Sequence, residues 1–317
     1  MIKISEEVVE ISNVNVTSCL HPHPLIEDSY ADLEEHWFSW IPGFDSTDLG
    51  DEDEEPLFRD NNIQLYERIE SIAVECFNKA LTNMWPLLHN YLINSIHITV
   101  DATGMLCNSS STLAGYNFVD STPPKGNYRF DLSPNYLQKL LISSTNGEKL
   151  SLKYNTIWEH EIIHLLDHYE SLKASVYAET DIATDYFKYY LLGFRIEGVA
   201  ELYFLLKGGR EDIKTISEAK DKFEKNLANI KKYISDNPIV TFKDKNEVYK
   251  SYDFYEVGPW IILDTLRTFE GGFHEDFIND IIKKVEAGEE IEHNVILDVL
   301  KIALRIKVED FLNFYIK

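Results

Sequence analysis

The sequence is poor in cysteine, in basic residues and in long apolar runs, and each shortage excludes a class of protein. Its three cysteines, Cys19, Cys76 and Cys107, lack paired spacing, which predicts neither a disulfide framework nor a thiolate metal site. Because 54 acidic side chains outnumber 30 basic ones, the net charge of −24 disfavours nucleic acid and anionic lipid as partners. No apolar run of about 18 residues occurs, so no membrane-spanning helix is predicted.

The composition and the first residues favour a globular protein of the cytoplasm. Hydrophobic residues make up 44% of the chain and aromatic residues 13%, which is enough for an ordinary core. Glu6 and Glu7 stand where a signal peptide would need an apolar segment, so no export signal is expected. A leader removed before this numbering begins remains open.

The spacing of apolar residues divides the chain into three parts. Residues 1–60, which include the acidic stretch Asp45–Glu55, are given no role. Residues 61–175 begin with a helical pattern over 63–84, and alternation then predicts three short strands, Ile96–Asp101, Ala114–Asp120 and Tyr128–Leu132. Residues 176–317 are helical in pattern and include a long amphipathic helix from Ile213 to Ile234. The predicted fold class is therefore α+β, with a small mixed sheet followed by a mostly α-helical C-terminal part.

The segment Trp158–Glu170 contains the strongest chemical signal, the pattern His-Glu-x-x-His. Residues four apart share one face of a helix, so His160 and His164 can bind a single ion. Two imidazoles suit zinc, and Glu161 at the edge of this face can reach a water activated by the metal. Random placement in this composition would produce the pattern about 0.03 times. The alternative is a helix whose histidines are ordinary polar groups at the edge of a core.

A catalytic zinc site needs a third protein ligand and an open fourth position. His168 would lie about 12 Å along the helix axis from His160, which is too far for one ion. Glu197 is the stronger candidate, and Glu201, one turn later, can accept a hydrogen bond from a liganding histidine. Gly198 would let this helix approach the histidine helix closely. The alternative is a pair of glutamates on a solvated helix face.

Asp167 is expected to support the site rather than to bind the metal. It follows His164 by three residues, so it lies near the same edge of the helix one turn later. There its carboxylate would orient nearby polar groups or receive a proton from them. An ordinary surface aspartate is the alternative.

These two motifs resemble those of the gluzincin zinc metallopeptidases, which carry His-Glu-x-x-His on one helix and a glutamate on a following helix. That glutamate often lies within Glu-Gly-x-Ala-Glu, as residues 197–201 do here. The resemblance implies a zincin-like fold in which His160, His164 and Glu197 bind Zn²⁺. It also implies that Glu161 is the general base.

Two local likenesses extend the resemblance. Residues 164–169 are similar to the His-x-x-Asp-x-Tyr continuation of lethal-factor-type members. Tyr255 and Gly258 form a Tyr-x-x-Gly step similar to that of the aminopeptidase branch, which implies that the Tyr255 hydroxyl donates to the oxyanion. Tyr252 and His274 are alternatives for this role, and an ordinary core tyrosine is the alternative for Tyr255 itself.

The function implied by the resemblance is zinc-dependent hydrolysis of peptide bonds in a peptide or protein substrate. An endopeptidase is expected, because no Gly-x-Met-x-Asn loop precedes the histidine helix. Leu113–Val119 is a candidate edge strand for an extended substrate, with a plain sheet strand as the alternative. The competing function is a catalytically silent, zinc-stabilised binding or scaffold protein of the same fold.

Overall fold

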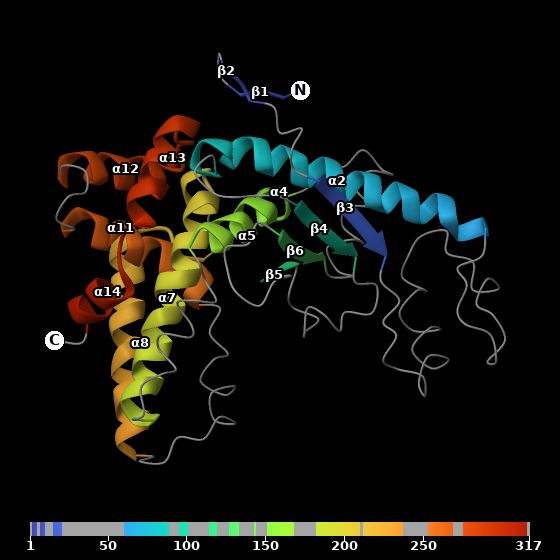
Figure 1. Cartoon of the computed structure of the whole chain (residues 1–317). Coiled ribbons are helices and arrows are strands. Elements are labelled where there is room, and N and C mark those ends of the chain that lie inside the picture. The colour runs from blue at the N-terminus through green and yellow to red at the C-terminus, as the bar shows by residue number, and fades with distance from the viewer. Residues whose placement is uncertain are drawn as a thin grey trace. The chain divides into compact units, whose positions relative to one another are not determined.

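The computed structural model divides the chain into two compact units, Met1–Glu161 and Ile162–Lys317. The division falls inside one continuous helix, α5 (Ile157–Leu166). Figure 1 labels most of the elements, and their numbers follow the chain. The acidic stretch Asp45–Glu55 lies outside the described residues. The structure describes residues 2–4, 7–9, 15–20, 60–88, 95–100, 114–118, 127–132, 143, 151–167, 182–209, 212–236, 253–268 and 275–315.

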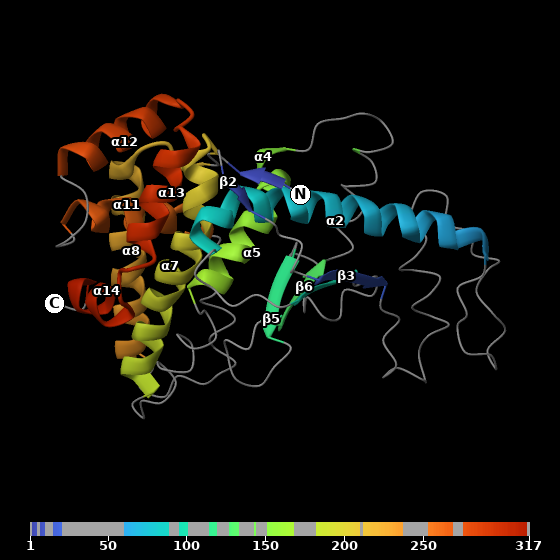
Figure 2. The same ribbon diagram turned by 45° about the horizontal axis from the view of Figure 1, so that its top comes forward.

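The first unit holds two helices, the beginning of α5 and six backbone strands among its described residues. The helices are α2 (Asp60–Leu88) and α4 (Leu152–Asn155). The strands are β1 (Ile2–Ile4), β2 (Glu7–Val9), β3 (Asn15–Leu20), β4 (Ser95–Val100), β5 (Ala114–Phe118) and β6 (Asn127–Leu132). β1 pairs with β2, and the other four pair in the order β3-β4-β6-β5, with only the β5–β6 pairing antiparallel. Figure 2 shows α2 running along β3, and α2 contacts both β3 and β4.

α2 confirms the helix predicted over residues 63–84 but is longer than expected. Its buried residues recur three or four positions apart, as in Phe77, Ala80, Leu81 and Met84. The predicted end at Trp85-Pro86 is wrong, because the helix includes Pro86 and continues to Leu88. Proline removes one backbone hydrogen bond. Burial of Leu87 and Leu88 stabilises the last turn despite that loss.

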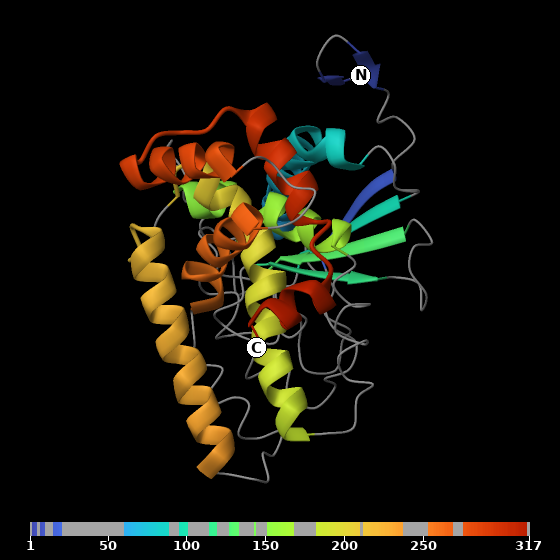
Figure 3. The same cartoon turned by 90° about the vertical axis from the view of Figure 1, so that its left-hand side faces the viewer.

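The second unit is a bundle of helices around α7 (Ile182–Leu206). From Tyr190 to Leu206, α7 is buried on nearly all sides, as expected for a helix that is apolar all round. Five of the other helices pack on it, namely α8, α10, α11, α13 and α14. Figures 1 and 3 show α7 running among the helices of this unit. The bounds are α8 (Ile216–Asp236), α10 (Asp253–Glu256), α11 (Gly258–Thr268), α12 (Glu275–Ala287), α13 (His293–Ala303) and α14 (Val308–Tyr315).

α8 confirms the long amphipathic helix that the sequence predicts. It buries one stripe, formed by Ala219, Phe223, Leu227 and Ile230, and exposes charged residues elsewhere. The ring of Phe223 meets that of Phe194 on α7 edge to face, with centroids 4.8 Å apart. None of the described helices has both the length and the apolar composition that crossing a bilayer demands.

The predicted α+β fold class is wrong. Among the residues whose side chains the structure describes, 85% are helical and none lies in a strand. Fold class follows from the elements that bury the core. Every buried side chain in the described part of the chain belongs to a helix or to a short connection between helices. The predicted strand segments pair through their backbones, whereas the described core packs helix against helix.

Candidate metal centre

α5 carries both predicted histidine ligands. His160 and His164 lie one turn apart on the same face of one uninterrupted helix, so their relative position follows from helical geometry alone. They are only 7% and 6% exposed. A second face of the helix is buried through apolar residues at positions i, i+4 and i+7, which are Trp158, Ile162 and Leu165.

α7 carries the predicted third ligand. The side chain of Glu197 is 16% exposed in a helix whose neighbouring positions, Ile196 and Gly198, are buried. Polar side chains are uncommon on a helix that is apolar all round, and those present are most often held by a specific partner. The position of Glu197 on α7 therefore points to a specific role for its carboxylate.

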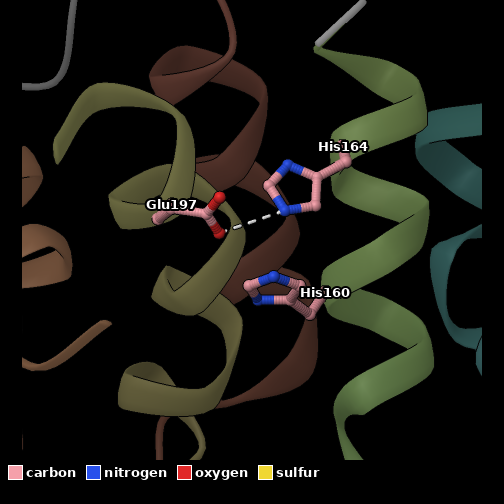
Figure 4. Close-up of side chains that lie close together, drawn as sticks. All are labelled: His160, His164 and Glu197. Atoms are coloured by element: carbon pink, nitrogen blue, oxygen red, sulfur yellow. Dashed lines mark ion pairs between the residues drawn. The ribbon is translucent and has the colours of Figure 1, made fainter. Parts of the chain in front are cut away.

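The three predicted ligands come together. His164 Nε2 lies 3.3 Å from Glu197 Oε2, and one ligand atom from each of His160, His164 and Glu197 lies within 4.8 Å of the other two. Figure 4 shows both imidazoles projecting from α5 toward the Glu197 carboxylate. That these residues bind zinc remains a prediction.

The donor chemistry of this cluster and the distance between two of its ligand atoms fit zinc. Ligand atoms about 2.1 Å from a tetrahedral zinc ion lie about 3.4 Å from one another. The 3.3 Å between His164 Nε2 and Glu197 Oε2 agrees with this separation. Two imidazole nitrogens and one carboxylate oxygen are also a donor set of catalytic zinc sites, which keep a fourth position for solvent or substrate. The alternative for this contact is a metal-free ion pair between a protonated histidine and the glutamate.

Glu161, the predicted base, is next to His160 in α5 and is 6% exposed. The preceding carboxylate, Glu159, is also buried, and its Oε1 accepts a hydrogen bond of 2.8 Å from Asn83 Nδ2 on α2. The ring of Trp158 packs edge to face on Phe77 of the same helix, with centroids 5.1 Å apart. These contacts within the first unit fix the N-terminal half of α5 against α2.

The cysteine of α2 does not extend the donor set. Cys76 is a free, partly buried thiol. Burial raises the pKa of Cys76, and the carboxylates of Glu75 and Glu159 raise it further, against a smaller lowering effect of Lys79. The thiolate is the form that binds metals, so this environment disfavours Cys76 as a ligand.

Asp167 lies at the end of α5 and is bound by a residue that the sequence analysis missed. Arg195 on α7 donates to Asp167 Oδ2 from Nη1 at 2.7 Å and to Oδ1 from Nη2 at 2.9 Å. Both residues are buried, so the alternative of a surface aspartate is wrong. A charged residue between Phe194 and Ile196, in the middle of an apolar helix, was the available signal for Arg195.

Two further predictions on α7 have different outcomes. Glu201 is 9% exposed and lies one turn after Glu197, so it is not on a solvated face, and its predicted hydrogen bond to a liganding histidine stays a prediction. The close approach predicted for Gly198 is to a different helix than expected. A Cβ at Gly198 would lie 2.7 Å from the backbone carbonyl of Gly258 at the start of α11. The absence of a side chain at Gly198 therefore serves the α7–α11 contact.

Tyr255 lies in α10 with 41% of its surface exposed, so it is not the core tyrosine that the alternative required. α10 packs on α7, the helix of Glu197. Lys222 on α8 holds this short helix by ion pairs with Asp253 at 2.6 Å and with Glu256 at 2.9 Å. The other predicted candidates, His168, Tyr252 and His274, lie outside the described residues.

Comparison with known proteins gives no relative, since no family model, no curated protein and no solved structure matches this chain. The likeness to gluzincins therefore rests on short motifs alone, and no family is assigned.

Proposed function

We propose that this protein is a zinc-dependent peptidase that cleaves peptide bonds inside peptide or protein chains. One observation carries the proposal, namely that His160, His164 and Glu197 place three metal-binding atoms within 4.8 Å of one another. The pattern that brings the two histidines together also places Glu161 beside them on the same helix. A purely structural zinc site would need the three ligands but not the Glu161 carboxylate.

A zinc ion held by these residues would supply a Lewis acid that polarises the substrate carbonyl and lowers the pKa of water. Glu161 accepts the proton of the attacking water on its carboxylate and passes it to the leaving amine.

Tyr255 is the proposed donor to the oxygen that becomes negatively charged during the reaction. A hydrogen bond from a tyrosine hydroxyl to that oxygen stabilises the transition state by on the order of 3 kcal/mol. The role requires a rigid α10, and two features of the second unit meet this requirement. Lys222 bridges Asp253 and Glu256 on either side of Tyr255, and Gly258 packs directly on Gly198.

The proposal is tested by metal analysis of protein purified without added zinc, followed by hydrolysis of a mixed peptide library with and without chelator. We expect stoichiometric zinc, cleavage at internal bonds, loss of cleavage on chelation and recovery on adding zinc back. Stoichiometric zinc without cleavage would refute the peptidase and favour the competing function, a catalytically silent, zinc-stabilised scaffold protein. The absence of bound zinc would refute both functions.

A further inference from the structure

Arg195 is the most completely buried charged side chain among the described residues, at 2% exposure. Its guanidinium binds the Asp167 carboxylate through two parallel hydrogen bonds of 2.7 and 2.9 Å. It also donates to the carbonyl oxygen of Ile306 from Nε at 3.1 Å and from Nη2 at 2.9 Å. One side chain of α7 thus binds the end of α5 and the segment that precedes α14.

This contact restricts where α5 and α7 can lie. A forked pair between a guanidinium and a carboxylate fixes orientation as well as distance. Separating the pair would leave two buried charges without compensation, so small displacements are resisted. The Asp167 amide donates to the Ile163 carbonyl at 2.9 Å, so Asp167 continues the helix and the restraint reaches His164 within one turn.

We propose that Arg195 is a positioning residue that sets the zinc affinity of the centre by holding His164 and Glu197 at coordination distance. The inference rests on the proposed zinc site and names a residue that the motif itself does not include. Arg195 is two residues from Glu197 in α7, and Asp167 is three residues from His164 in α5. The 3.3 Å between the two ligand atoms (Figure 4) is therefore set by a second contact between the same two segments. Metal sites tolerate errors of only about 0.2 Å in ligand position, which makes such a contact effective.

A purely structural ion pair is the competing explanation, and the second unit contains a matched control. Asp264 on α11 is also a buried carboxylate, at 8% exposure against 7% for Asp167. It pairs with Lys220 Nζ at 3.0 Å and with Arg267, and it belongs to neither ligand helix. Removing the charge of Asp264 therefore imposes a comparable loss of ion pairing away from the proposed ligands.

The experiment compares Asp167→Asn, Arg195→Lys and Asp264→Asn with the unchanged protein. The zinc dissociation constant is measured by competition with a chromophoric chelator, below the unfolding temperature of every variant. We expect Asp167→Asn and Arg195→Lys to weaken zinc binding about 10- to 100-fold, as for other residues that orient metal ligands. Asp264→Asn should lower the melting temperature and leave the dissociation constant unchanged. Arg195→Lys keeps the positive charge but cannot form the two parallel hydrogen bonds to Asp167. Its zinc dissociation constant therefore reports the effect of bonding geometry apart from that of charge.

The visible spectrum of the Co²⁺-substituted proteins gives a second readout, because its band positions report ligand geometry and not stability. We expect altered bands in Asp167→Asn and unchanged bands in Asp264→Asn. Equal zinc affinity in Asp167→Asn and the unchanged protein would overturn the positioning role, as would equal losses in Asp167→Asn and Asp264→Asn. If Arg195→Lys does not fold, the nearly isosteric Asp167→Asn still tests the positioning role. Failure of the unchanged protein to bind zinc would instead refute the proposed function.

Discussion

Gly198 and Gly258 touch through their backbones, and each occupies a position where the other leaves no room for a side chain. A Cβ at Gly198 would lie 2.7 Å from the carbonyl carbon and oxygen of Gly258, and a Cβ at Gly258 would lie 2.9 Å from the Cα of Gly198. Gly198 directly follows Glu197, and Gly258 lies three residues after Tyr255. The contact therefore joins the helix of the proposed third ligand to the turn of the proposed oxyanion donor.

Replacing Gly198 with alanine should destabilise the protein by about 1–3 kcal/mol, because the new methyl group meets backbone that cannot move aside. Helix propensity alone would favour alanine by about 1 kcal/mol, so a net loss isolates the steric effect. Urea unfolding measures it. Gly208→Asn is the control, since Gly208 has a positive φ of 85° that asparagine tolerates and no neighbour within 4 Å of a Cβ. Equal stability of Gly198→Ala and the unchanged protein would contradict the contact.

Glu161→Gln should lower peptide hydrolysis by about 100- to 10,000-fold, because the amide cannot accept the proton. Zinc content should stay stoichiometric, since this residue is not a proposed ligand. The measurements are turnover with a cleavable peptide and metal analysis of the same preparation. Glu159→Gln is the matched control, because Glu159 is equally buried on the same helix and an amide oxygen can still accept from Asn83. Near-normal turnover in Glu161→Gln would eliminate the proposed base.

Glu197→Ala should lose most bound zinc, whereas Glu201→Ala should weaken zinc binding by roughly 10- to 100-fold, as for a residue that orients a ligand. The exposed Glu224 on α8 provides the control, and Glu224→Ala should bind zinc normally. Zinc dissociation constants of the three variants are compared under identical conditions. The same constant in all of them would count against the assigned ligand set.

Tyr255→Phe should reduce kcat by about 100- to 1,000-fold with little change in KM or in zinc content, because only a transition-state hydrogen bond is lost. Tyr233→Phe on α8 is the control. Lys222→Met tests the support of α10, since it removes the ion pairs to Asp253 and Glu256. We expect kcat of Lys222→Met to lie between those of the unchanged protein and Tyr255→Phe. Full activity of Tyr255→Phe would exclude the hydroxyl from the reaction.

Tyr315 should make the protein less stable at alkaline pH. Burial raises the pKa of Tyr315 to about 12, against smaller lowering effects of its hydrogen bond with Thr265 and of Arg267. An unfolded tyrosine ionises near pH 10, so between about pH 10 and 12 the unfolded chain loses a proton that the folded protein keeps. This raised pKa stabilises the folded protein fully below pH 10, and the contribution is lost as pH rises toward 12, by roughly 3 kcal/mol.

The measurement for Tyr315 is urea unfolding across this range for the unchanged protein and for Tyr315→Phe. The phenylalanine variant should be less stable by about 1 kcal/mol near neutral pH, because its hydrogen bond with Thr265 is lost. The difference in unfolding free energy between the unchanged protein and Tyr315→Phe should shrink and then reverse above pH 10. Parallel stability curves for the two proteins would show that Tyr315 ionises normally in the folded state.

The clustering of the three proposed ligands could be predicted because most of the information is local. The i, i+4 spacing of His160 and His164 fixes their shared face once the segment is helical. Glu197 required one additional assumption, that a second helix carries a carboxylate toward the first. In the structure the three residues meet.

The surroundings of the site could not be predicted, because they depend on contacts between distant segments. Arg195 was visible as a charge in an apolar helix, but nothing in the sequence connects it to Asp167 or to the carbonyl of Ile306. Gly198 signals a close approach without naming the helix that approaches. The prediction of the fold class was wrong for the same reason. Alternation of apolar and polar residues predicts strands, whereas the core is determined by how the elements pack.

The hydrogen bonds from Arg195 to the Ile306 carbonyl join the segment before α14 to the helix of the proposed ligand Glu197. Shortening the protein before this residue would remove two of the four bonds that hold the guanidinium, together with the buried Phe311 of α14. A version trimmed for crystallisation or for display would therefore hold Asp167 and Arg195 less rigidly, although every proposed ligand would still be present.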